Sequence, residues 1–163
     1  MVDIPKKLNR EKLYKYGERS ENILYDIIKQ YRDDAVFTDR YNHFDYIIES
    51  DDKIVVIELK TRTFGKDTFK TTFLPLSKIT YYNNFKKQNA NKKTYFLVIF
   101  GFPLNIFDLD NCSFEYYAIQ YKMDIFNNYK ITNNPYDFDK NINISIEDLK
   151  PVEYYLNIIK TFI

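Results

Sequence analysis

The sequence predicts an α/β fold in which a mixed central sheet is flanked by helices. Two stretches have the length and the β-branched and aromatic content of central strands: 53–61, which contains the consecutive apolar residues 54–57, and 95–102, which is apolar without interruption. One amphipathic helical pattern precedes the first stretch, and another lies between the two. We therefore expect the core order α-β-β-β-α-β, followed by C-terminal strand and helix additions.

The first half of the core follows residues 1–14, which are basic and are expected to form an irregular arm. From Gly17 onward, apolar residues recur at helical spacing, namely Leu24, Ile27, Ile28 and Tyr31. Strands are expected next at 35–38, 43–49 and 53–61. The polar turn 50–52 joins the last two strands and predicts a hairpin.

The second half of the core begins with a polar loop at 63–73. Ser77 fits the N-cap of a helix over 77–88, and a strand is expected at 95–102. Beyond it we expect an edge strand at 114–121, a short helix at 122–130 and an Asn-rich loop at 133–143. A helix start at 145–148 and a closing amphipathic helix at 152–163 are expected to follow. No repeat or Gly/Pro-rich break divides the chain, so 1–163 is taken as one domain with a core (17–101) and a C-terminal extension (102–163).

The composition excludes several classes of protein. The 163 residues are 45% hydrophobic and 29% charged, which fits neither a disordered tail nor a membrane protein. No apolar run approaches the roughly 18 residues of a membrane span, and the N-terminal segment lacks the apolar core of a secretory signal. A single cysteine, Cys112, excludes an internal disulfide and a zinc site built on several thiolates. We therefore expect an intracellular, non-secreted protein. Its net charge of +1 does not by itself indicate a nucleic-acid partner.

Two charged side chains stand near the end of the apolar strand at 53–61. Because side chains alternate along a strand, Glu58 and Lys60 project from one face and Leu59 from the other. Asp45, on the preceding strand of the hairpin, is expected close to Glu58. Two carboxylates beside an ammonium group offer Mg²⁺ oxygen ligands, and the lysine can position a water or offset charge on a phosphate. The spacing alone is equally compatible with a cross-strand salt bridge on an exposed sheet face.

This pattern resembles the PD-(D/E)XK nuclease superfamily, which has a restriction-endonuclease-like fold. The resemblance rests on Asp45, a gap of twelve residues and then Glu58-x-Lys60, within a core (17–101) whose elements follow the expected order. Phe44 stands where the name of the family has a proline, at a position that carries no chemistry.

The resemblance implies a role for each of these residues. Asp45 and Glu58 would ligate Mg²⁺ together with the backbone carbonyl of Leu59, and Lys60 would be the catalytic lysine. Many members of the family add an acid from the first helix.

Glu18 and Glu21 are the candidates for that helix acid. Glu21 is preferred because it lies one helical step before Leu24 on the buried face. Gly17 also precedes it by four residues, as in the resolvase-like branch of the family.

Three further side chains are expected to face the backbone of a nucleic acid. Thr61 and Arg62 follow the catalytic lysine directly, and a hydroxyl and a guanidinium suit phosphate oxygens. Lys78 lies near the start of the second helix, where the helix dipole also favours anions.

The function implied by the resemblance is that of a Mg²⁺-dependent deoxyribonuclease, with Mn²⁺ as a substitute and an endonuclease favoured over an exonuclease. DNA is the expected partner, and a homodimer is expected because dimers are common in the family. The sequence contains no phosphate-binding loop, so no nucleotide cofactor is expected. The alternative is a catalytically silent, nuclease-like module that binds nucleic acid or protein.

Several aromatic residues near these motifs are open to two interpretations. His43 and the tyrosine pairs at 81–82 and 116–117 have rings that can stack on bases. The chain contains 16 tyrosines, however, so ordinary packing is the default interpretation.

Overall fold

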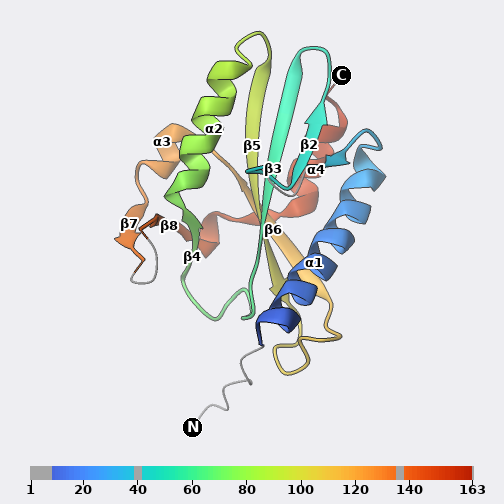
Figure 1. Cartoon of the computed structure of the whole chain (residues 1–163), viewed down its shortest axis with the longest axis vertical. Helices are drawn as coiled ribbons and strands as arrows, with labels where there is room; N and C mark the ends of the chain where they lie inside the picture. Colours follow the sequence, from blue (N-terminus) through green and yellow to red (C-terminus); the bar gives the residue numbers. More distant parts are fainter. Residues whose placement is uncertain (1–8, 39–41, 135–137, 163) are drawn as a thin grey trace.

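The structure is a computed structural model of the chain, and it describes residues 9–38, 42–134 and 138–162. In this part of the chain, a mixed sheet has six strands in the order β1-β2-β3-β5-β6-β9 (Figure 1). The strands are β1 (Val36–Phe37), β2 (Tyr46–Glu49), β3 (Lys53–Thr61), β5 (Lys93–Pro103), β6 (Phe114–Gln120) and β9 (Lys150–Pro151). β3 and β5 pair in parallel, and every other neighbouring pair in this sheet is antiparallel. The predicted α/β class with a mixed sheet is confirmed.

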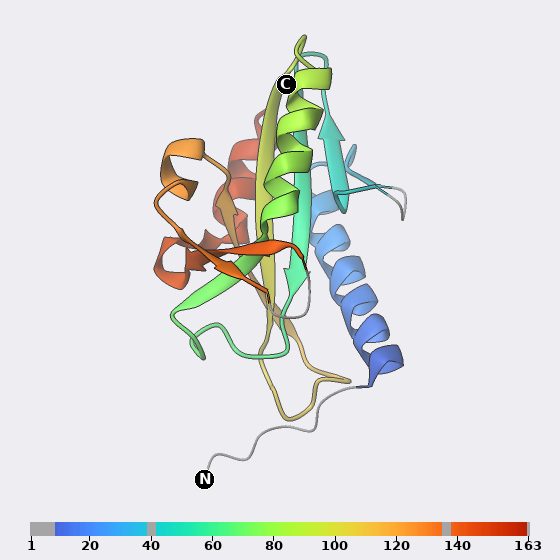
Figure 2. The same cartoon turned by 60° about the vertical axis from the view of Figure 1, so that its left-hand side comes forward.

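β3 is the central strand because six consecutive residues, 54–59, are buried. Its side chains alternate between two apolar cores, one on each face of the sheet. α1 (Arg10–Tyr31) and α4 (Val152–Lys160) cover one face. α2 (Leu76–Gln88) and a second sheet cover the other (Figure 2).

The second sheet has the strand order β4-β8-β7 and is an addition that the sequence did not predict. Its strands are β4 (Thr71–Pro75), β7 (Lys130–Asn133) and β8 (Lys140–Ser145). The segments 63–73 and 133–143 were expected to be loops because they are polar. In β4, however, Thr72 and Leu74 are buried while Thr71 and Phe73 are exposed, so one face packs on the core. Residues 135–137 lie outside the described part of the chain.

The first helix begins earlier than predicted. α1 starts at Arg10, and Asn9 caps it by accepting a hydrogen bond of 2.9 Å from the Lys12 amide. The expected irregular arm at 1–14 is therefore wrong for residues 10–14, which are helical, while residues 1–8 lie outside the described ranges. The expected start at Gly17 was late because the first turns of α1 are exposed and carry no apolar period.

The predicted cap of the second helix was also wrong. Pro75 occupies the N-cap position of α2, and Ser77 lies inside the helix. The amide and hydroxyl of Ser77 instead donate to the carboxylate of Asp139, at 3.2 and 2.5 Å. This contact joins α2 to the start of β8.

The predicted C-terminal strand, short helix, helix start and closing helix occur in the expected order with shorter bounds, and the unpredicted strands β7, β8 and β9 lie between them. β6 pairs with both β5 and β9 and is therefore not an edge strand. The short helix α3 spans Met123–Phe126, and the expected helix start at 145–148 is a single 3₁₀ turn, Ile146–Asp148. No helix in the described ranges is both long and apolar enough to cross a membrane.

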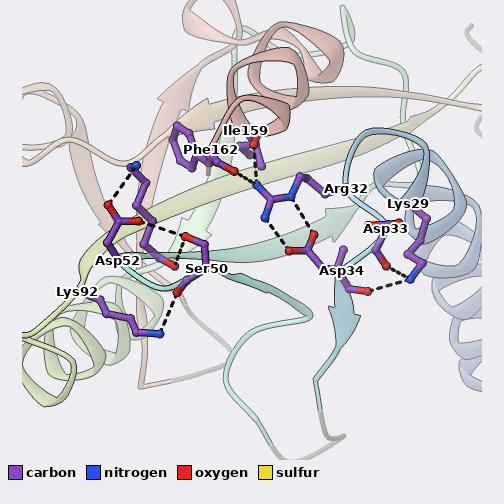
Figure 3. A network of polar contacts seen from close by, with 11 residues as sticks. Lys29, Arg32, Asp33, Asp34, Ser50, Asp52, Lys92, Ile159 and Phe162 are labelled. Carbon is purple, nitrogen blue, oxygen red and sulfur yellow. Dashed lines mark hydrogen bonds and ion pairs between the residues drawn. The ribbon is translucent and has the colours of Figure 1, made fainter.

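A polar network ties the end of α1 to the end of α4 (Figure 3). The Arg32 guanidinium donates to the carbonyl of Ile159 at 3.1 Å and to the carbonyl of Phe162. It also forms a two-pronged pair with Asp34, at 2.8 and 2.6 Å. Carbonyls at the end of a helix lack partners within it, so Arg32 caps α4 from outside.

Candidate active site

Glu58 lies at the centre of a buried charged cluster. β3 directs Glu58 and Lys60 to the face of the sheet that α2 covers, as their alternation predicts. One carboxylate oxygen of Glu58, Oε1, lies 3.2 Å from Lys60 Nζ and 3.1 Å from Lys78 Nζ. The other, Oε2, is buried and finds no hydrogen-bond donor among the described residues. Because the Glu58 side chain is only 4% exposed, a salt bridge on an exposed sheet face does not describe this site.

Asp45 lies directly beyond the end of β2. The pairing of β2 with β3 begins at Tyr46, so the Leu59 amide on β3 has no strand partner on that side, and Asp45 Oδ2 accepts its hydrogen bond at 2.7 Å. The amide and the carbonyl of one strand residue point to the same side of the strand. The Leu59 carbonyl therefore points toward the side of β3 on which Asp45 lies.

Burial and neighbouring charges change the pKa values of Glu58 and Asp45 to different extents. The pKa of Glu58 is raised to about 7, because burial and the charge of Asp45 raise it by more than Lys60 and Lys78 lower it. Burial also raises the pKa of Asp45, while the hydrogen bond from the Leu59 amide, the charges of both lysines and a side-chain hydrogen bond with Glu58 lower it. Asp45 therefore raises the pKa of Glu58, while Glu58 lowers that of Asp45. Glu58 is the acid of the pair that holds a proton more readily.

α1 brings Glu21 close to Asp45. Burial raises the pKa of the Glu21 carboxyl, and the charge of Asp45 is the next cause. Glu18 is exposed on the same helix. The geometry thus favours Glu21 over Glu18 as the helix acid, as the helical spacing predicts.

The position of Glu21 depends on a close approach of α1 to the sheet. The neighbouring Ser20 is fully buried, and its hydroxyl accepts a hydrogen bond of 2.9 Å from Thr61. It lies over Gly101 of β5, where an added Cβ would come within 3.1 Å of the Ser20 oxygen. A side chain at position 101 would therefore push α1 away from the sheet.

Lys78 has a position that the sequence did not predict. Its ammonium group bonds Glu58 and also donates to the backbone carbonyl of His43 at 2.9 Å. The expectation that it faces a nucleic-acid backbone stays a prediction, and its contact with Glu58 was not foreseen. The contact depends on how α2 rotates against β3, which helical spacing alone does not determine.

Thr61 and Arg62 have partners within the protein. The Thr61 hydroxyl is bonded to Ser20, as described above. The Arg62 guanidinium donates to the Thr72 hydroxyl at 3.1 Å and to the Phe73 carbonyl, and it lies 4.2 Å from the centre of the Phe73 ring. Burial lowers the pKa of Arg62 to about 10. These contacts join the end of β3 to β4, and phosphate contact by either residue stays a prediction.

The residues fit a hard cation in their chemistry. Asp45, Glu58 and the Leu59 carbonyl supply oxygen donors only, and the buried Glu58 Oε2 accepts no hydrogen bond from a donor group of the described residues. In the arrangement seen, the described residues contain no group of three or more acids, histidines or cysteines close enough to share an ion. Ligation by Glu21 as a third acid therefore stays a prediction.

A separate surface hollow lies along the outer side of α1. It measures about 610 Å³, and its walls come from residues of α1 alone, among them Glu18 and Arg19. A groove bounded by a single helix has no second wall to enclose a ligand, and it includes neither Glu58 nor Lys60. We therefore take the charged cluster as the candidate site.

The comparisons with known proteins do not name a family. No protein-family model matches the sequence, and no curated protein matches it significantly. The functional argument therefore rests on the geometry of the cluster.

Proposed function

We propose that the chain is a Mg²⁺-dependent nuclease that hydrolyses phosphodiester bonds of DNA. The observation that carries the proposal is the buried Glu58, which shares one oxygen with two lysines and keeps the other unpaired beside Asp45. Burying several charges is costly, and a buried acid without a complete set of partners is more typical of a functional site than of a structural one.

The fold is compatible with a restriction-endonuclease-like core. The elements α1, β1, β2, β3, α2 and β5 follow the order α-β-β-β-α-β, with β4 added between β3 and α2. The hairpin of β2 and β3 carries Asp45 and Glu58, and α1 supplies Glu21 from the opposite face. This arrangement supports the family resemblance and is part of the proposal.

Asp45, Glu58 and the Leu59 carbonyl would hold the cation. When bound, Mg²⁺ polarises a scissile phosphate and lowers the pKa of an attacking water. Glu58 would have to release its proton to act as a ligand, and the two lysines favour that ionised form.

The two lysines supply the positive charge of the site. The Lys60 and Lys78 side chains are 26% and 20% exposed, so each reaches from the buried carboxylate toward the surface. In the proposed reaction Lys60 orients the attacking water, and both ammonium groups offset the negative charge that develops on the phosphate.

The test is a cleavage assay with supercoiled, linear, single-stranded and four-way-junction DNA, in Mg²⁺, Mn²⁺ or EDTA. We expect metal-dependent cutting that is lost in Glu58→Ala and in Lys60→Ala. Circular dichroism of each variant verifies that the protein is folded.

The chain offers a matched control for these variants. Lys92 and Glu49 also form a Lys–Glu ion pair, at 2.8 Å, but the Glu49 side chain is 56% exposed. Glu49→Ala and Lys92→Ala should cut as the parent protein does. Full activity of folded Glu58→Ala or Lys60→Ala would exclude the assignment. DNA binding that is equal in Mg²⁺ and EDTA, without cutting, would favour the silent binding module.

A further inference from the structure

An exposed pair of stacked rings lies beside the charged cluster. His43 and Tyr81 stack with ring centres 3.5 Å apart and planes inclined by 13°. His43 is exposed, and Tyr81 is 36% exposed. Aromatic pairs contribute to packing through the ring surface that they bury. This pair leaves ring surface open to solvent.

The neighbouring tyrosine of α2 shows the contrast. Tyr82 is buried, stacks on Phe96 and donates a hydrogen bond of 2.9 Å to the Thr94 carbonyl. Tyr82 is thus a packing residue, as a tyrosine-rich composition predicts. Tyr81 is on the outer side of the same helix, and packing does not explain its place.

Lys78 connects the stacked rings to the candidate site. Its ammonium group contacts Glu58 Oε1 at 3.1 Å and the His43 carbonyl at 2.9 Å. Tyr81 follows Lys78 by three residues, so both side chains lie on one side of α2. His43 precedes Asp45 by two residues. The rings are therefore held at the edge of the acid and lysine cluster from two directions.

We propose that His43 and Tyr81 form a platform on which an unpaired base of DNA stacks next to the scissile phosphate. The flat faces of bases stack on aromatic side chains irrespective of sequence, and lysines beside the platform attract the phosphates that flank the base. Bases in a duplex are already stacked inside it, so the platform selects single-stranded DNA or DNA with an unpaired flap. This substrate class rests on the proposed nuclease function, whereas base stacking itself is measurable without cleavage.

The experiment uses the full chain in EDTA, with a single-stranded oligodeoxynucleotide that carries one 2-aminopurine. Stacking quenches the fluorescence of this base, so the titration reports contact with the rings directly. Tyr81→Ala should lose the quenching and bind the single strand about tenfold more weakly, while binding to a fully paired duplex stays unchanged. Tyr81→Phe should retain both properties because it keeps the ring.

Tyr154→Ala is the matched control, since Tyr154 is exposed on α4 at the other face of the sheet. It should bind and quench as the parent protein does. The platform is excluded if the parent protein does not quench, or if Tyr81→Ala weakens single-stranded and duplex binding equally. Quenching that depends on Tyr81, without any cutting of DNA, would support the platform and exclude the nuclease function. Cutting without quenching would support the nuclease function and exclude the platform.

Discussion

Two charged clusters of this protein differ in how completely their groups are paired. At the Arg32 cluster, where α1 meets α4, one guanidinium satisfies a carboxylate and two backbone carbonyls (Figure 3). At the Glu58 cluster, two lysines share one oxygen, and the other oxygen has no hydrogen-bond donor among the described residues. Arg32 lowers the pKa of Asp34, whereas burial and Asp45 raise the pKa of Glu58.

These opposite shifts have opposite consequences for stability. An acid whose pKa is lowered in the folded state stabilises the protein when ionised, and an acid whose pKa is raised destabilises it when ionised. The Arg32 cluster thus contributes to folding, and the Glu58 cluster costs stability. Groups that reduce stability are expected where a protein retains them for function.

The largest expected difference between the clusters is in activity. Glu58→Gln should lower the rate of DNA cleavage by at least about a hundredfold, because it removes a charged ligand and the anion that the lysines face. At about pH 5, where Glu58 is protonated, the free energy of unfolding of the variant should stay within about 1 kcal/mol of the parent value, since glutamine resembles the protonated acid. Single-turnover cleavage and urea unfolding measure the two quantities. A large loss of stability with unchanged activity would make Glu58 a structural residue.

The next effect is a pH dependence of stability in the absence of metal. Because the pKa of Glu58 is raised to about 7, the folded state binds its proton more readily than the unfolded state does. The free energy of unfolding in EDTA should therefore fall between about pH 5 and about pH 8, by up to about 3 kcal/mol.

Glu58→Gln serves as the control for this titration and should flatten the profile. Asp34 makes the opposite contribution, which is present at neutral pH and is lost only in acid, as the pH falls through its lowered pKa. A profile that rises from mildly acidic to mildly alkaline pH in EDTA would contradict the raised pKa of Glu58.

The smallest expected effect is at the Arg32 cluster. Arg32→Ala should lower the free energy of unfolding by about 1–2 kcal/mol, because carbonyls at the end of α4 and the Asp34 carboxylate lose their donor. Arg32→Lys should recover only part of this loss, since an ammonium group lacks the two-pronged geometry. Cleavage per folded molecule should not change in either variant. Reduced cleavage at full stability would show that the two clusters are coupled.

The parts of the fold and site that follow from a local period were predictable. Alternation along β3 placed Glu58 and Lys60 on one face, and the helical period of α1 placed Glu21, but not Glu18, on a partly buried side of the helix, while its role as the helix acid stays a prediction. The apolar strands β3 and β5 were equally evident, because full burial leaves an uninterrupted apolar sequence.

The contacts that depend on packing between distant segments were not predictable. β4 and β8 are polar on one side and form a sheet only because their other side meets the core. Because β4 was not predicted from the sequence, the contacts of Arg62 with Thr72 and Phe73 could not be predicted either. Lys78 reaches Glu58 only through the rotation of α2 against β3, and no pattern in the sequence of α2 encodes that rotation.

The parallel pairing of β3 with β5 also has a consequence for how the protein folds. The chain must complete β4 and α2 before β5 can return to lie beside β3. Pairings between distant segments form slowly, because the entropy of closing the loop is lost before the contacts compensate for it. The β2–β3 hairpin brings Asp45 and Glu58 together locally, whereas Lys78 lies on α2, within the crossover. Recovery of activity should therefore be a late event in refolding, and a chain truncated before β5 should lack the site altogether.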